Sequence, residues 1–123
     1  MKYLIMIYGN PKSREIWDSF SEAERAEGWK FYAALHESLV ASGEMIVAEA
    51  LTDPSQARRV PVTDTRATLT DGPFPEVKEQ LAGFFLVDCE SFDRAMEIAA
   101  QIPEAPLGLV EVRPVLAMTG PDM

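Results

Sequence analysis

The residues best suited to acid–base chemistry are a single histidine and one short charged segment. His36 is the only histidine of the chain, and the segment from Asp71 to Glu79 reads DGPFPEVKE. A neutral imidazole can carry protons near neutral pH. A carboxylate can remove a proton while a nearby ammonium group stabilises the anion that develops. The chemistry that these residues suggest is proton transfer on a small molecule.

His36 falls on an apolar side of a predicted helix. It shares that side with Trp29, Tyr32, Leu39 and Val40, so the helical period predicts an inward-pointing ring. A ring in that environment has a lowered pKa or a hydrogen-bond partner, and either condition leaves a neutral base. The alternative is a core histidine satisfied by a hydroxyl or a backbone carbonyl. No metal is expected, because zinc needs three or four converging ligands and no other His or Cys is near in sequence.

The charged segment begins with a predicted turn. Asp71 can accept backbone N–H groups, and Gly72 can adopt the dihedral angles of a sharp turn. Pro73 and Pro75 stiffen the loop. Phe74, between two prolines, cannot join a regular ladder on both sides, so we expect it to fill an apolar hollow under the loop.

The acids and the lysine that follow are expected at the mouth of the next strand. Asp71 or Glu76 is the candidate base, Lys78 the candidate anion-stabilising group, and Glu79 lies beside them. Glu111 and Arg113 alternate outward on the last predicted strand and can line the same cleft. The alternative is an ordinary charged turn, in which surface ion pairs are worth under about 1 kcal/mol.

Composition excludes several classes of partner. The chain has 123 residues and a formal net charge of −9, with no basic cluster larger than Arg58 and Arg59, so nucleic acid is not an expected ligand. The apolar run 3–8 is too short for a signal peptide or a membrane span. Cys89 is the only cysteine and is expected to be a small apolar filler. The expected location is the cytoplasm.

Hydrophobic patterns and turn residues predict one domain, residues 1–123, of the α+β class. The first helix is bounded by a Ser21/Glu24 capping box and by Gly43, and Ser91 is expected to cap a second helix that Pro103 stops. The predicted strands are Lys2–Tyr8, Met45–Leu51, Leu81–Cys89 and Leu109–Met118, the first helix is Glu22–Ser42, and a hairpin pairs Arg59–Val62 with Ala67–Thr70. This order is ferredoxin-like (βαββαβ) with a hairpin inserted between the halves.

Both faces of the predicted sheet are apolar. Right-handed crossovers put both helices on one face. The first strand nevertheless has Tyr3, Ile5 and Ile7 on one side and Leu4, Met6 and Tyr8 on the other. We therefore expect a homodimer in which sheet packs on sheet. The alternative is that the hairpin folds over the second face.

The stretch DGPFPEVKEQLAGF closely resembles the signature of the YCII-related proteins, in the branch with the pattern DGPFxExKExLGGF. The opening MKYLIMIYG and the closing VEVRPV extend the resemblance over almost the whole chain. Ala82 departs from the pattern, which has glycine there. The resemblance implies a ferredoxin-like fold of the dimeric α+β barrel type.

The resemblance also implies functions and residues. It implies a small enzyme or ligand binder that uses a His/Asp pair, with His36 in the helix where the family histidine lies, or a regulatory partner of alternative sigma factors. The positions carried over by the motif are Asp71, Gly72, Pro73, Phe74, Glu76, Lys78 and Glu79.

Two hypotheses follow. The first is a cytoplasmic homodimer with a pocket for an unknown small molecule between the first helix, the DGPF loop and the sheet, where His36 shuttles protons, Asp71 orients it and no cofactor takes part. The second is a non-catalytic module that senses a metabolite or binds a regulatory protein, and it predicts an exposed patch away from the dimer face.

Overall fold

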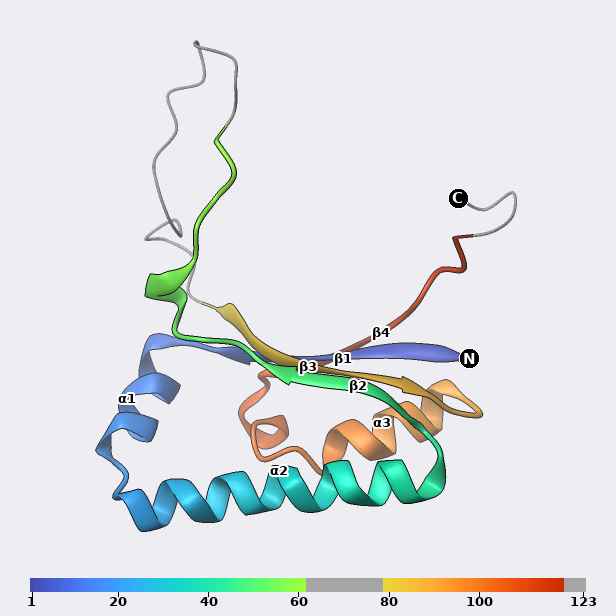
Figure 1. Ribbon diagram of the computed structural model, residues 1–123, viewed down its shortest axis with the longest axis horizontal. Coiled ribbons are helices and arrows are strands. Elements are labelled where there is room, and N and C mark those ends of the chain that lie inside the picture. Colours follow the sequence, from blue (N-terminus) through green and yellow to red (C-terminus); the bar gives the residue numbers. More distant parts are fainter. Residues whose placement is uncertain (62–78, 119–123) are drawn as a thin grey trace.

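The computed structural model describes residues 1–61 and 79–118. Four strands, three helices and two short 3-10 turns follow one another along this part of the chain (Figure 1). They are β1 (Lys2–Gly9), α1 (Pro11–Ser19), α2 (Glu22–Ser42), β2 (Met45–Ala50), η1 (Pro54–Gln56), β3 (Gln80–Asp88), α3 (Phe92–Ala100), η2 (Ala105–Leu107) and β4 (Val110–Pro114).

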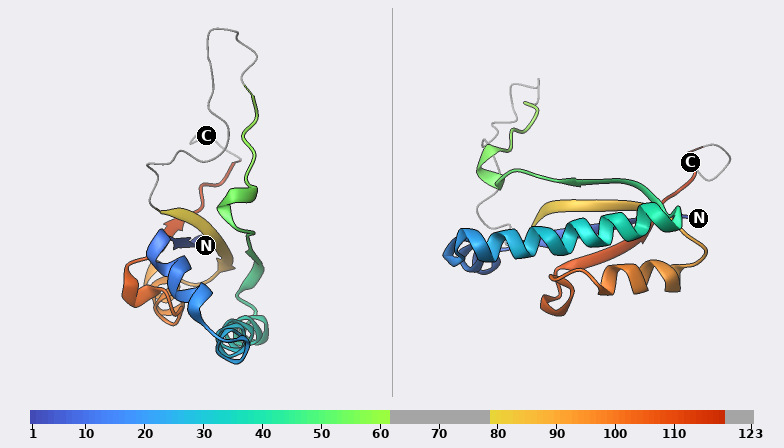
Figure 2. Two further views of the ribbon diagram at one scale, coloured as in Figure 1. Left: turned by 90° about the vertical axis from the view of Figure 1, so that its left-hand side faces the viewer. Right: turned by 60° about the horizontal axis from the view of Figure 1, so that its bottom comes forward.

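The strands form one antiparallel sheet in the order β2-β3-β1-β4. Each β-α-β half therefore leaves room for one strand of the other half between its own two strands, which is the ferredoxin-like topology predicted from the sequence. All three helices lie on one side of the sheet (Figures 1 and 2), as right-handed crossovers require. The fold has two layers, and no described helix covers the second face of the sheet.

The helix boundaries follow capping signals in the sequence. The Ser21 hydroxyl accepts from the backbone N–H of Glu24, whose carboxylate accepts from that of Ser21, and Gly43 ends α2 in the left-handed conformation, φ 83°. Both predicted limits of α2 are confirmed. The Ser91 hydroxyl likewise accepts from the backbone N–H of Arg94 at the start of α3.

Helix α1 is absent from the sequence-based prediction. The predicted first strand ends at Tyr8 and no helix is predicted before Glu22, whereas Asn10 caps a helix with Pro11 at its first position. A reciprocal capping box joins Asn10 to Ser13. The signal was present, because Asn followed by Pro and, two residues later, Ser is a helix start as well as a strand stop.

The core lies between the helices and the near face of the sheet. The sheet contributes alternate residues of β1 and β3 to the core. The helices contribute residues of α2 and α3 that are almost fully buried, such as Leu39 and Ile98. The buried members are Tyr3, Ile5, Ile7, Leu35, Leu39, Phe85, Val87, Cys89, Ala95, Ile98, Ala99 and Ile102. The alternation predicted for the first strand is confirmed, with Tyr3, Ile5 and Ile7 on the helix side.

The predicted hairpin falls mainly on residues 62–70, outside the described part of the chain, and Arg59–Pro61 are not in a strand. The final strand is shorter than predicted and ends at Pro114, although Val115 still donates its backbone N–H to the carbonyl of Lys2 at 2.9 Å.

Candidate functional site

The face of the sheet turned away from the helices is apolar at its centre. On β1 it carries the half-buried side chains of Leu4, Met6 and Tyr8, and on β3 those of Phe84 and Leu86. Cross-strand pairing places Leu86 beside Leu4 and Phe84 beside Met6, so these side chains form two adjacent rows. The sequence-based expectation of a sheet that is apolar on both faces is confirmed.

Charged groups border this open face on the edge strands. The register pairs Arg113 with Leu4 and Glu111 with Met6 on the β4 side, while Glu49 pairs with Phe84 on the β2 side. Glu49, Glu111 and Arg113 are exposed. A face with an apolar centre and a few charged groups at its border is typical of small-molecule sites and of interfaces.

Two described segments leave the sheet on the open side. The chain after η1 and the chain after β4 both extend away from the helix layer, at opposite ends of the sheet (Figures 1 and 2). Both carry exposed apolar side chains: Val60 is 88% exposed on the first, and Leu116 and Met118 are 60% and 74% exposed on the second.

His36 does not point into the core, so the expectation of an inward ring is wrong. The side chains that α2 buries are Leu35 and Leu39, one turn apart, and His36 is exposed. The apolar side used to orient it was a flank of the helix, where Trp29 and Val40 are 54% and 57% exposed. Because α2 has apolar residues around much of its circumference, the pattern alone does not identify the face that packs.

The predicted site residues are only partly placed. Asp71, Gly72, Pro73, Phe74, Glu76 and Lys78 lie outside the described residues, and Glu79 is exposed directly before β3. Gln80 pairs with Gly9 at the end of the sheet where α2 begins. His36 is 14 residues along α2, about 20 Å from that start. The structure therefore does not bring His36 and Glu79 together within one chain.

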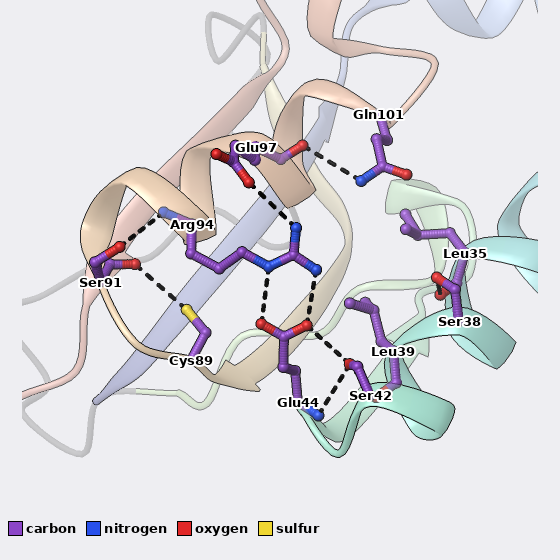
Figure 3. Close-up of polar contacts among 10 residues, drawn as sticks. All are labelled: Leu35, Ser38, Leu39, Ser42, Glu44, Cys89, Ser91, Arg94, Glu97 and Gln101. Atoms are coloured by element: carbon purple, nitrogen blue, oxygen red, sulfur yellow. Dashed lines mark hydrogen bonds and ion pairs between the residues drawn. The ribbon is translucent and has the colours of Figure 1, made fainter.

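The strongest polar contact of the helix layer joins α3 to the turn between α2 and β2 (Figure 3). Arg94 donates from Nε and Nη2 to the two carboxylate oxygens of Glu44, at 2.9 and 2.8 Å. These hydrogen bonds, with one from Ser42, lower the pKa of Glu44 to about 2, and the hydrogen bonds to Glu44 and Glu97 raise the pKa of Arg94. The paired charges fix two elements 50 residues apart and leave neither group available for proton transfer near neutral pH.

A second long-range contact joins Tyr32 of α2 to Glu104 before η2. The Tyr32 hydroxyl donates to the Glu104 carboxylate, and its ring packs on Phe85 and Trp29. Burial, together with the hydrogen bond to Glu104, raises the pKa of Tyr32. Tyr32 therefore stays protonated, and its contacts are those of a structural residue. No sequence signal links residues 72 positions apart, and this pair was not predicted.

Cys89 is a packing residue, as expected. Its side chain is buried, its thiol lies 3.4 Å from the carbonyl oxygen of Ser91, and burial raises the pKa of the thiol. Raising the pKa removes the thiolate that nucleophilic chemistry requires.

Two features are absent from residues 1–61 and 79–118. No three or more His, Cys, Asp or Glu side chains converge there in a way that could hold a metal ion. None of the described helices is long and apolar enough to cross a membrane.

A family model and a related protein each match most of this chain. The family model of a YCII-related domain matches residues 1–119. The uncharacterized protein R00369 of Rhizobium meliloti (strain 1021) is 32% identical over 117 residues, which cover 94% of this chain and 92% of that protein.

One solved structure has a similar fold. It is 5-chloro-2-hydroxyhydroquinone dehydrochlorinase (TftG) from Burkholderia phenoliruptrix AC1100 in complex with 2,5-dihydroxybenzoquinone. It superposes with a TM-score of 0.53 and 18% sequence identity, and the match covers 94% of each chain. At that identity the likeness is one of fold.

Proposed function

This chain belongs to the YCII-related family, and on that premise we propose that it binds a small molecule on the open face of its sheet. The observation that carries the proposal is the apolar centre of that face, formed by Leu4, Met6, Tyr8, Phe84 and Leu86 and bordered by charged groups. Soluble monomers rarely leave such a surface uncovered. The proposed location is the cytoplasm, and the proposed activity uses no cofactor.

We further propose that a second copy of the chain covers this face and that the ligand is enclosed between the two sheets. The support for this assembly is the apolar centre of the face, which an identical face can cover under two-fold symmetry, and the two exposed segments that extend on the same side. Segments carrying Val60, Leu116 and Met118 at opposite ends of the sheet can pack along the edges of the partner.

One charge-introducing substitution tests the assembly. Phe84→Glu places a carboxylate in the centre of the face, where burying it unpaired would weaken association by more than tenfold. Sedimentation velocity should show a dimer for the wild type and a monomer for this variant. Val40→Glu, on the exposed flank of α2, is the matched control and should remain a dimer. A folded wild-type monomer at micromolar concentration would refute the proposal.

The finer proposal is acid–base catalysis by His36 with Asp71. His36 is exposed to solvent within the second half of α2. A first probe is 2,5-dihydroxybenzoquinone, the ligand of the structural neighbour. His36→Ala and Asp71→Asn should abolish the thermal shift that the probe produces and leave the dimer intact. Unfolding of both variants would instead assign these residues to the structure.

A second candidate function is a protein-interaction module. One observation favours it: α2 exposes Trp29, Phe31 and Val40 on the helix layer, away from the sheet face. Affinity capture with the wild type should then recover a stoichiometric protein partner that Trp29→Ala fails to recover, and no small molecule should raise the melting temperature.

A further inference from the structure

Two buried polar atoms at one end of the sheet have no hydrogen-bond partner. They are Nη1 of Arg14 on α1 and Oε1 of Gln80, the first residue of β3, and they are the only such side-chain atoms within residues 1–61 and 79–118. Buried polar groups are almost always paired. Leaving a guanidinium group unpaired costs more than leaving a neutral group unpaired. A buried donor and a buried acceptor that both lack a partner suggest a binding site in which a ligand supplies the two missing hydrogen bonds.

Backbone geometry places both side chains in the same corner. The Cα atoms of Gln80 and Gly9 are paired, and a Cβ built on Gly9 would point at the Ser13 hydroxyl, 3.7 Å away, so side chains at this pair project toward α1. Arg14 follows Ser13, and its backbone N–H bonds to the carbonyl of Asn10 at 3.0 Å. Figure 1 shows α1 beneath the end of the sheet where β3 begins.

The charge of Arg14 has no close counter-ion among the described residues. The chain has 20 acidic and 11 basic residues, yet no described carboxylate forms an ion pair with this guanidinium group. Among the carboxylates, Asp53 has a pKa that is lowered by hydrogen bonds from Ser55 and, to a smaller extent, by the charge of Arg14. Asp53 is exposed, caps η1 and forms no ion pair with Arg14, so among the described residues the partly buried cation is not neutralised by a direct contact.

We propose that Arg14 and Gln80 bind a small organic anion that carries a hydroxyl or N–H group next to its charged oxygen. Arg14 donates to the anionic oxygen, and Gln80 accepts from the neighbouring hydroxyl or N–H. This inference goes beyond the proposed function, because α1 and the Gln80 side chain lie on the helix side of the sheet and not on the open face proposed for the small molecule. It adds two residues that are not among those predicted from the sequence.

Three related probes separate charge from hydrogen bonding. Salicylate has both a carboxylate and an adjacent hydroxyl, benzoate lacks the hydroxyl, and salicylamide lacks the charge. Titration calorimetry with the wild-type protein should give the affinity order salicylate, benzoate, salicylamide. Arg14→Gln should weaken salicylate and benzoate by about tenfold or more, the loss expected for a hydrogen bond to a charged group. Gln80→Ala should reduce the affinity for salicylate to that for benzoate.

Two further variants separate a binding role from a structural one. Lys12→Ala removes an exposed cation from the same helix and should leave all three affinities unchanged. Arg14→Met removes the unpaired buried charge but keeps the length of the side chain, so its melting temperature without ligand should equal or exceed that of the wild type. A marked fall for Arg14→Met would show that the guanidinium group holds the fold together, which would overturn the proposal.

Other results would also refute the proposal. They are equal binding of salicylate and salicylamide, salicylate binding unchanged in Arg14→Gln, or no binding of any probe by the wild type. The sheet-face proposal is tested separately, because Phe84→Glu acts on assembly without any anion. A dimer that Phe84→Glu dissociates, with no effect of Arg14→Gln on salicylate, would retain the sheet-face assembly and reject the anion site.

Discussion

The ion pair between Glu44 and Arg94 gives a quantitative prediction about stability and pH. Hydrogen bonds from Arg94 and Ser42 lower the pKa of Glu44 from 4.5 to about 2. A carboxyl group with that difference between the unfolded and folded states contributes up to about 3 kcal/mol at neutral pH. Because the side chains of Glu44 and Arg94 are 16% and 30% exposed, solvent screens the pair and we expect about 1–2 kcal/mol.

The sign of the pH dependence follows from the direction of the shift. Glu44 has a lowered pKa in the folded state, so its contribution is complete above its unfolded pKa of 4.5 and is lost as pH falls toward about 2. Glu44→Gln mimics the protonated carboxyl group. The difference in unfolding free energy between the wild type and this variant should therefore be largest at pH 6–7 and should shrink steadily below about pH 4.5.

Urea denaturation at fixed protein concentration, repeated between pH 3 and pH 7, measures this difference. Glu97→Gln is the matched control, because Glu97 contacts the same arginine at 3.2 Å but is 68% exposed. Its effect should stay below about 0.5 kcal/mol. A cost for Glu44→Gln that does not change with pH, or an equal cost for Glu97→Gln, would refute the assignment of the stabilisation to the ionised pair.

Three further substitutions, two of them paired with a control, are tested by the same denaturation assay, and the helix-cap substitution is tested by amide exchange as well. Leu39→Ala should destabilise by about 2–5 kcal/mol because the side chain is 1% exposed, whereas Val40→Ala, at 57% exposure, should cost under about 1 kcal/mol; similar values would contradict the placement of α2. Gly83→Ala should cost about 1–3 kcal/mol, since its Cβ would lie 2.9 Å from a backbone oxygen of β2, while Gly9→Ala meets nothing closer than 3.7 Å and should be nearly neutral. Ser21→Ala removes a helix cap and should cost about 1 kcal/mol; no loss of helix stability by amide exchange would argue against the capping box.

Much of the fold could be predicted from the sequence because its signals are local. Ser21, Glu24 and Gly43 bound a helix through bonds to neighbouring backbone groups, and those bonds are the same in any tertiary context. The alternation of apolar residues in β1 predicted which side chains face each side of the sheet, and the crossover rule placed the helices on one face. Helix α1 could have been predicted by the same local logic from Asn10 and Pro11.

The placement of individual side chains depended on the tertiary structure. His36 was assigned to the core because apolar residues surround most of α2, and only packing against β1 and β3 selected the face of Leu35 and Leu39. The partners Glu44 and Arg94 are 50 residues apart, and Tyr32 and Glu104 are 72 apart, so no local pattern joins them.

Short-range backbone preferences and the hydrophobic period thus determined the elements, their order and an apolar second face of the sheet. Tertiary packing decided which flank of α2, a helix with apolar residues on several sides, is buried. It also decided which charges pair, and that Nη1 of Arg14 and Oε1 of Gln80 are buried without a hydrogen-bond partner. The physical reason is that capping and periodicity act between neighbours in the chain, whereas burial and ion pairing depend on distances in space that arise only when the strands are in register.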